Sequence, residues 1–138
     1  MVVIDGEGKI AFVGDEQEVP RTCDVVDCGG ALITPGLVEC HSHIVFGGDR
    51  SKEWELKLAG ASYEEVARAG GGIVNTVGGT REATVEEPVQ SAGPRVQALM
   101  EEGVTTLEIK SGYGLNEEAE RKMLVAARKL GQMFPITV

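Results

Sequence analysis

The first 34 residues carry short apolar runs separated by turn-forming residues. Residues 2–4 and 9–14 lie on either side of a segment with two glycines, and this pattern predicts two strands joined by a tight turn. Residues 24–28 and 31–33 are further runs of branched apolar residues, which are typical of short strands. We expect these strands to form part of a small β-sandwich domain that spans residues 1–34.

After Thr34 the pattern changes to strands that alternate with helices. Two helices are expected to begin at capping boxes, Ser62-x-x-Glu65 and Thr84-x-x-Glu87. The predicted order is a strand at 37–43, helices at 51–58, 62–70 and 84–103, a strand at 104–110, a helix at 117–130, and a strand that begins at 134.

The sequence predicts further detail for two of these helices. Gly93-Pro94 lies within the helical stretch after Thr84, so we expect a kink or a break there, because proline lacks an amide hydrogen and clashes with the preceding turn. The helix at 117–130 is expected to bury Leu124, Ala127 and Leu130 and to end at Gly131.

Alternating strands and helices indicate parallel α/β architecture. A complete barrel of eight β/α units takes about 250 residues, so a chain of 138 residues holds only the first two or three units. We therefore expect residues 35–138 to form an incomplete β/α barrel. Because the chain stops within a predicted strand, we expect it to be an N-terminal fragment of a longer protein.

Composition and charge restrict the class of protein to which the chain can belong, but they do not identify a substrate. Hydrophobic residues make up 42% of the chain and charged residues 25%, as in globular proteins. The formal net charge of −9 argues against nucleic-acid binding and against anionic membranes, and no run approaches the roughly 20 apolar residues of a membrane span. Three cysteines (Cys23, Cys28 and Cys40) without a secretion signal favour a reducing, cytoplasmic setting.

The only two histidines of the chain, His41 and His43, close the predicted strand at 37–43. Residues two apart in a strand point to the same face, so both imidazoles can reach one metal ion. Catalytic zinc sites use about three protein ligands and leave a position for water, and in parallel barrels such ligands sit at the carboxyl ends of strands. The alternative interpretation is a chance pair of histidines in a strand.

Two further residues are candidates for substrate contact. Arg50 ends the glycine-rich loop after the histidines, and its planar guanidinium suits a carboxylate, although a solvated surface arginine is the alternative. Tyr113 lies between two glycines after the strand at 104–110, where it either contacts a ligand or anchors the loop on the next helix.

Other polar residues are assigned structural roles. We expect Lys110 to form a salt bridge and Cys40 to face away from His41. The acidic residues after the first strand of the barrel are interpreted as solvated or capping charges; these are Glu53, Glu55, Glu64 and Glu65.

Several segments resemble known families. Residues 34–43, with Thr-Pro-Gly followed by His-x-His, resemble the first metal-binding strand of the amidohydrolase superfamily. The more specific segments resemble the imidazolonepropionase family, which acts in histidine degradation; they are residues 46–50, 58–65, 69–73 and 108–115.

The resemblance implies a β-sandwich beside a metal-dependent β/α barrel that holds one zinc or iron ion. It implies hydrolysis of 4-imidazolone-5-propanoate to N-formimidoyl-L-glutamate, with His41 and His43 as metal ligands and Arg50 and Tyr113 as substrate contacts. The remaining metal ligands and the catalytic residues of the family are expected downstream of Val138, so this chain alone is expected to be inactive. The resemblance is also compatible with a homodimer of the parent enzyme.

Two other functions remain open at this stage. One is another amidohydrolase or deaminase that acts on a cyclic amide, which the segments at 69–73 and 111–114 argue against. The other belongs to a different class, a stand-alone domain without catalytic activity.

Overall fold

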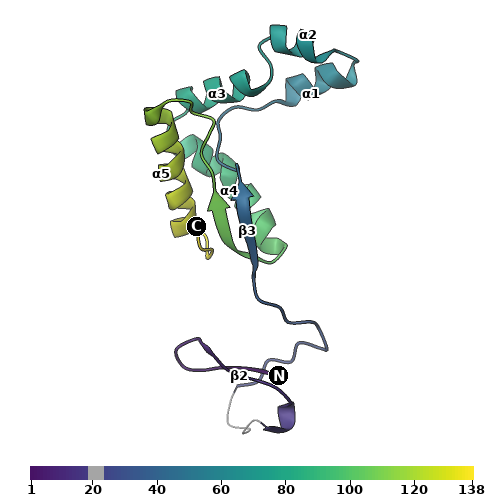
Figure 1. Cartoon of the computed structure of the whole chain (residues 1–138), viewed down its shortest axis with the longest axis vertical. Coiled ribbons are helices and arrows are strands. Elements are labelled where there is room, and N and C mark those ends of the chain that lie inside the picture. Colours follow the sequence, from purple (N-terminus) through teal and green to yellow (C-terminus); the bar gives the residue numbers. More distant parts are fainter. Residues whose placement is uncertain (19–23) are drawn as a thin grey trace. The chain divides into compact units, whose positions relative to one another are not determined.

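The computed structural model describes residues 1–18 and 24–138, so Cys23 lies outside the described residues. The chain divides into two compact units, Met1–Thr34 and Pro35–Val138. Figure 1 shows the helices and strands of both units.

The first unit contains a hairpin of two antiparallel strands, β1 (Val2–Ile4) and β2 (Ile10–Val13). The carboxylate of Asp5 accepts hydrogen bonds from the backbone N–H groups of Glu7 and Lys9, both at 2.9 Å, and these bonds close the turn. The predicted hairpin is therefore confirmed. A short 3-10 helix, η1 (Glu16–Glu18), follows it.

The prediction of strands at residues 24–28 and 31–33 is wrong. These residues have no regular structure, and the side chains of Val26 and Leu32 are 85% and 89% exposed. A bend between them is held by a hydrogen bond from the N–H of Gly29 to the carboxylate of Asp27. A strand needs a neighbour for its backbone groups, and within the described residues these segments pair with none.

The second unit is built around parallel strands. Strand β3 (Leu37–Ser42) pairs in parallel with β4 (Val104–Ile109), and Figure 1 shows the two arrows side by side. On the other edge of β4, Thr137 forms a parallel bridge with Thr106, and its N–H donates to Thr105 at 3.0 Å. The strand expected to begin at 134 is thus represented by this bridge alone.

Five helices follow β3 in the second unit. They are α1 (Ser51–Leu58), α2 (Tyr63–Arg68), α3 (Ile73–Glu82), α4 (Glu86–Glu101) and α5 (Glu117–Met133). Helices α4 and α5 contact each other, and their apolar side chains form one core with those of β4. The largest fully buried residues are Val45, Thr80, Pro88, Val96, Leu107, Met123 and Leu130. The core formed by α4, α5 and β4 stabilises the sheet that carries the histidines.

Both predicted capping boxes are confirmed. The Ser62 hydroxyl accepts from the N–H of Glu65 while the Glu65 carboxylate accepts from the N–H of Ser62. Thr84 and Glu87 make the same reciprocal pair at the start of α4. These bonds satisfy amide groups that have no partner within the helix, so they define where α2 and α4 begin.

A kink or a break was expected at Gly93-Pro94. The break does not occur, since α4 runs continuously past Pro94 to Glu101, and the kink stays a prediction. Proline removes one backbone hydrogen bond from a helix. Here Ala92 and Val96, on either side of Pro94, are fully buried in the core, and this packing holds the helix together across the missing bond.

Helix α5 differs from the prediction in two respects. Ala127 and Leu130 are buried as expected, but Leu124 is half exposed. The helix also continues beyond Gly131 to Met133, since Gly131 packs closely against Val138 rather than ending the helix.

Helix α3 has no counterpart among the predicted elements, because Gly78 and Gly79 are typical of loops. The structure explains Gly79 by a close approach of two backbones: a Cβ atom at Gly79 would lie 2.9 Å from the nitrogen of Gly48. Thr80, which follows, is fully buried and accepts a hydrogen bond at 3.0 Å from the N–H of Gly47. The glycines thus allow α3 to pack on the loop after β3.

The fold is mixed α/β with two small sheets, and the described residues form no closed barrel. No helix in the described part of the chain is both long enough and apolar enough to cross a bilayer.

Candidate metal and substrate site

His41 and His43 lie together at the carboxyl end of β3. Their ring centroids are 5.2 Å apart, with an angle of 62° between the ring planes. The ring of His41 is exposed, whereas His43 is half-buried. The structure therefore brings both predicted ligands to one edge of the sheet.

The nitrogen Nδ1 of His43 is buried and has no hydrogen-bond partner among the described residues. A buried polar atom without a partner is costly, so a ligand that binds this nitrogen would remove an unfavourable contribution to folding. A metal ion is a ligand that imidazole nitrogens bind well. Within residues 1–18 and 24–138, however, no group of three or more His, Cys, Asp or Glu side chains is placed to hold a metal ion. The two imidazoles fit part of a coordination shell.

Tyr113 packs directly against His43. Its ring centroid lies 5.5 Å from that of His43 and 6.0 Å from that of Phe46. The backbone at Gly112 comes close to the same imidazole, because a Cβ atom there would lie 3.4 Å from Cε1 of His43. Gly112 also has a φ of +135°, which disfavours any residue with a side chain. Gly112 therefore lets the loop approach His43, while Gly114 lets it pack against the start of α5 at Ala119.

The Tyr113 loop is held by Glu120 of α5. The carboxylate of Glu120 accepts hydrogen bonds at 2.8 Å from the N–H groups of Gly114 and Leu115. Partial burial raises the pKa of Glu120, but hydrogen bonds from Ser111 and the loop backbone outweigh it and lower the pKa overall. Sequence reasoning missed Glu120, whose signal was an acidic residue in the first turn of a helix directly after a glycine loop.

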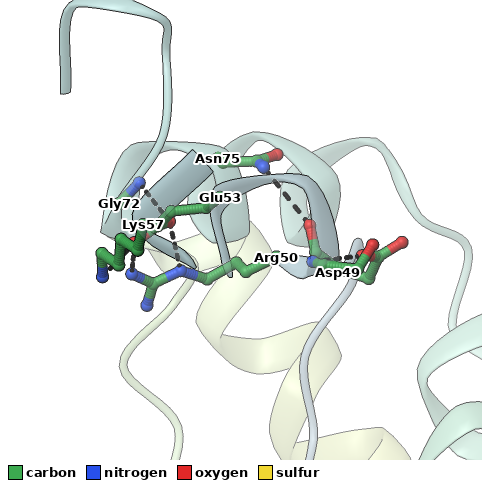
Figure 2. A network of polar contacts seen from close by, with 7 residues as sticks. Asp49, Arg50, Glu53, Lys57, Gly72 and Asn75 are labelled. Carbon is green, nitrogen blue, oxygen red and sulfur yellow. Dashed lines mark hydrogen bonds and ion pairs between the residues drawn. The ribbon is translucent and has the colours of Figure 1, made fainter. Parts of the chain in front are cut away.

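Arg50 lies at the N-terminus of α1, after the loop that follows β3. Figure 2 shows its guanidinium facing Glu53, with Nε donating to Oε2 at 2.7 Å and Nη2 donating to Oε1 at 2.5 Å. These bonds raise the pKa of Arg50, because they stabilise the charged guanidinium.

The interpretation of Glu53 as a solvated or capping charge is wrong. Its side chain is 6% exposed, and it also accepts hydrogen bonds from Lys57 at 2.9 Å and from the backbone N–H of Gly72 at 2.7 Å. The hydrogen bond from Arg50 is the main cause that holds its pKa far below the ordinary value, followed by those from Lys57 and Gly72. The signal in the sequence was the spacing Arg50, Glu53, Lys57, which places all three on one face of a helix.

The structure also shows the environment of the other polar residues for which a structural role was predicted. Glu65 is a capping residue and Glu64 is exposed, as predicted. Lys110 forms an ion pair with Glu108, as predicted. Cys40 is a free, exposed thiol.

Comparison with known proteins identifies relatives of this chain. No family model matches it. An imidazolonepropionase of Rhizobium rhizogenes is 54% identical over 99% of this chain and 34% of its own length. Imidazolonepropionases of Paracoccus denitrificans and Pseudomonas entomophila are 56% and 55% identical over 95% and 99% of this chain, and again over 34% of their own length.

The chain thus spans about a third of the length of the curated relatives that it matches. In each of these comparisons more than half of the aligned residues are identical, over 95% or more of this chain. The chain is therefore homologous to imidazolonepropionases over about a third of their length.

Proposed function

We propose that this chain is part of a metal-dependent hydrolase that opens the ring of 4-imidazolone-5-propanoate to give N-formimidoyl-L-glutamate. The observation that carries the proposal is the pair of adjacent imidazoles, one with a buried nitrogen that lacks a partner, at the carboxyl end of a parallel strand. Homology to imidazolonepropionases supports the same reaction.

The proposed architecture follows that of the amidohydrolase superfamily. Residues 1–34 belong to a β-sandwich domain, and residues 35–138 form the first β/α units of a barrel. The parallel order of β3, β4 and Thr137 supports this assignment, since successive strands of such a barrel lie side by side in chain order. We also propose a cytoplasmic location, and a homodimer stays a prediction.

His41 and His43 would hold one zinc or iron ion, and other parts of the enzyme would supply its remaining ligands and the catalytic acid and base. Such an ion, when bound, lowers the pKa of water and so supplies a hydroxide nucleophile near neutral pH. The ring of His43 packs on Tyr113 and Gly112, so one of its imidazole nitrogens is shielded from water and held in a fixed position.

The substrate carries an anionic carboxylate and a ring amide. Arg50 keeps its positive charge at any physiological pH and binds the anionic part or the ring oxygen. The ring of Tyr113 packs on His43, where it contacts the substrate ring and limits the access of water.

A turnover assay tests the proposed reaction. The full-length protein that contains this chain, loaded with zinc or iron, is expected to convert imidazolonepropanoate to formimidoylglutamate, whereas the isolated 138 residues are expected to show no turnover. Absence of product from the loaded full-length protein would refute the reaction. Turnover by the isolated chain would refute the need for ligands from elsewhere.

Replacement of Arg50 tests its contact with the substrate. In the full-length enzyme, Arg50→Ala is expected to raise KM by about 10–100-fold, with a smaller change in kcat, because a charge-assisted contact to bound substrate is lost. Steady-state kinetics measure both constants. An unchanged KM would remove Arg50 from the binding site.

A further inference from the structure

Glu53 is a buried carboxylate that the proposed reaction leaves without a role. It lies in α1, one turn after Arg50, and forms the centre of the polar network in Figure 2. A carboxylate has about four acceptor positions. All are used here: Oε1 accepts from Arg50 and Lys57, and Oε2 accepts from Arg50 and the N–H of Gly72. A carboxylate bound in this way is held in one orientation.

The pairing uses only one edge of the guanidinium. Arg50 donates from Nε and Nη2 to Glu53, which occupies two of its five N–H groups. The opposite edge, formed by Nη1 and the second hydrogen of Nη2, has no acceptor in the part of the chain that the structure describes. The arginine side chain is 48% exposed, against 6% for Glu53, so Arg50 is open to solvent while its partner is buried.

The anchor of this pair is rigid. Glu53 binds the backbone of Gly72, and the preceding Gly71 has no room for a side chain, because a Cβ atom there would lie 2.7 Å from Cγ1 of Val66. The carboxylate is therefore clamped between α1 and the glycine turn that leads into α3. A group that is fixed before the ligand arrives loses little entropy on binding.

The network stays cationic in spite of its ion pairs. The three paired side chains carry a net charge of +1, since Arg50 and Lys57 are positive and Glu53 is negative; Asp49, also drawn in Figure 2, pairs with Ser51 instead. Its free edge consists of two parallel N–H groups on a planar fork. Such an edge matches a planar anion with two oxygens, which it binds through two hydrogen bonds.

We propose that Glu53 is a positioning residue that holds Arg50 side-on, so that the free guanidinium edge binds the carboxylate of the substrate. This inference rests on the proposed function and refines it, because it assigns Arg50 to the propanoate group rather than to the ring oxygen. The glycine turn at residues 70–72 takes part indirectly, as the support of Glu53.

The test compares two competitive inhibitors of the full-length enzyme that have nearly the same shape but differ in the charge and hydrogen bonding of the terminal group. One is 3-(imidazol-4-yl)propanoate, and the other is its uncharged amide. Glu53→Gln keeps the shape of the side chain but loses its charge and part of its acceptor capacity. The variant is expected to raise Ki for the carboxylate about tenfold and Ki for the amide less than about twofold, since only the anion needs the oriented fork.

Two controls accompany this variant. Glu64→Gln removes a glutamate of α2 that pairs with Arg68 on the surface, and both inhibition constants are expected to stay at the wild-type values. In an Arg50→Ala background, Glu53→Gln is expected to cause no further loss of carboxylate binding, because Glu53 acts through Arg50. Thermal unfolding shows whether each variant folds.

Several outcomes would overturn the inference. They are equal changes of both inhibition constants, no change of either, and a further tenfold loss in the Arg50→Ala background. If Glu53→Gln fails to fold, Glu53→Asp takes its place. Ki for the carboxylate is again expected to rise more than Ki for the amide, and an unchanged ratio of the two constants would contradict the inference. Failure of the wild-type enzyme to act on imidazolonepropanoate would instead refute the proposed function, so the two failures are distinguishable.

Discussion

At the scale of single residues, the candidate site depends on one imidazole nitrogen. Nδ1 of His43 is buried without a hydrogen-bond partner among the described residues, in a setting formed by Tyr113 and Gly112. Burial of a polar atom without a partner opposes folding unless a ligand satisfies it. The spacing of His41 and His43 predicted a shared face, and the structure adds that the second ring is partly shielded from water.

Removal of this imidazole tests its role as a ligand. In the full-length protein, His43→Ala is expected to lower the metal content well below about one ion per chain, because a catalytic site has only three or four protein ligands. Metal analysis after dialysis gives the content. Tyr113→Phe serves as the control, since it keeps the ring that packs on His43 and should retain the metal. Wild-type metal content in His43→Ala would contradict the assignment.

At the scale of elements, local sequence signals predicted the helices that have capping boxes and the two strands of the main sheet. Ser62 with Glu65 and Thr84 with Glu87 specify the starts of α2 and α4 through bonds that span only three residues. Helix α3 was not predicted, because the close approach that requires Gly79 involves a partner far away in the sequence. Gly79 of this helix contacts the backbone of Gly48.

The two glycines of α3 give a matched pair of substitutions. Gly79→Ala is expected to destabilise the protein by about 1–3 kcal/mol, because the new Cβ atom would press on the backbone of Gly48, which cannot rotate away. Gly78→Ala meets open space within a helix and is expected to stabilise by about 0.5–1 kcal/mol. Chemical denaturation measures both changes. Equal effects of the two substitutions would contradict the packing of α3 on the loop after β3.

At the scale of the whole molecule, the buried carboxylate of Glu53 makes the stability of the fold depend on pH. The pKa of Glu53 in the folded chain is far below its ordinary value, because Arg50, Lys57 and Gly72 stabilise the charged form. A group whose pKa is lowered by folding contributes stability above its ordinary value of about 4.3, and the contribution is lost as the pH falls toward the folded value. The network should therefore weaken as the solution becomes acidic.

Thermal unfolding at several pH values checks this expectation. The melting temperature of the wild-type protein is expected to fall more steeply below about pH 4.5 than that of Glu53→Gln, which has no proton to take up at this position. Glu64→Gln is expected to follow the wild-type curve, since its exposed ion pair contributes little. Parallel curves for wild type and Glu53→Gln would show that the network does not govern acid stability.

The sequence by itself determined the alternation of strands and helices, both capping boxes and the adjacent positions of His41 and His43. Each of these depends on residues within one or two turns of each other. Only the tertiary structure decided that residues 24–33 form no strand, that Leu124 is half exposed and that Glu53 is buried. Pairing and burial depend on partners far along the chain, such as Gly72, whose amide lies 19 residues beyond the carboxylate it binds.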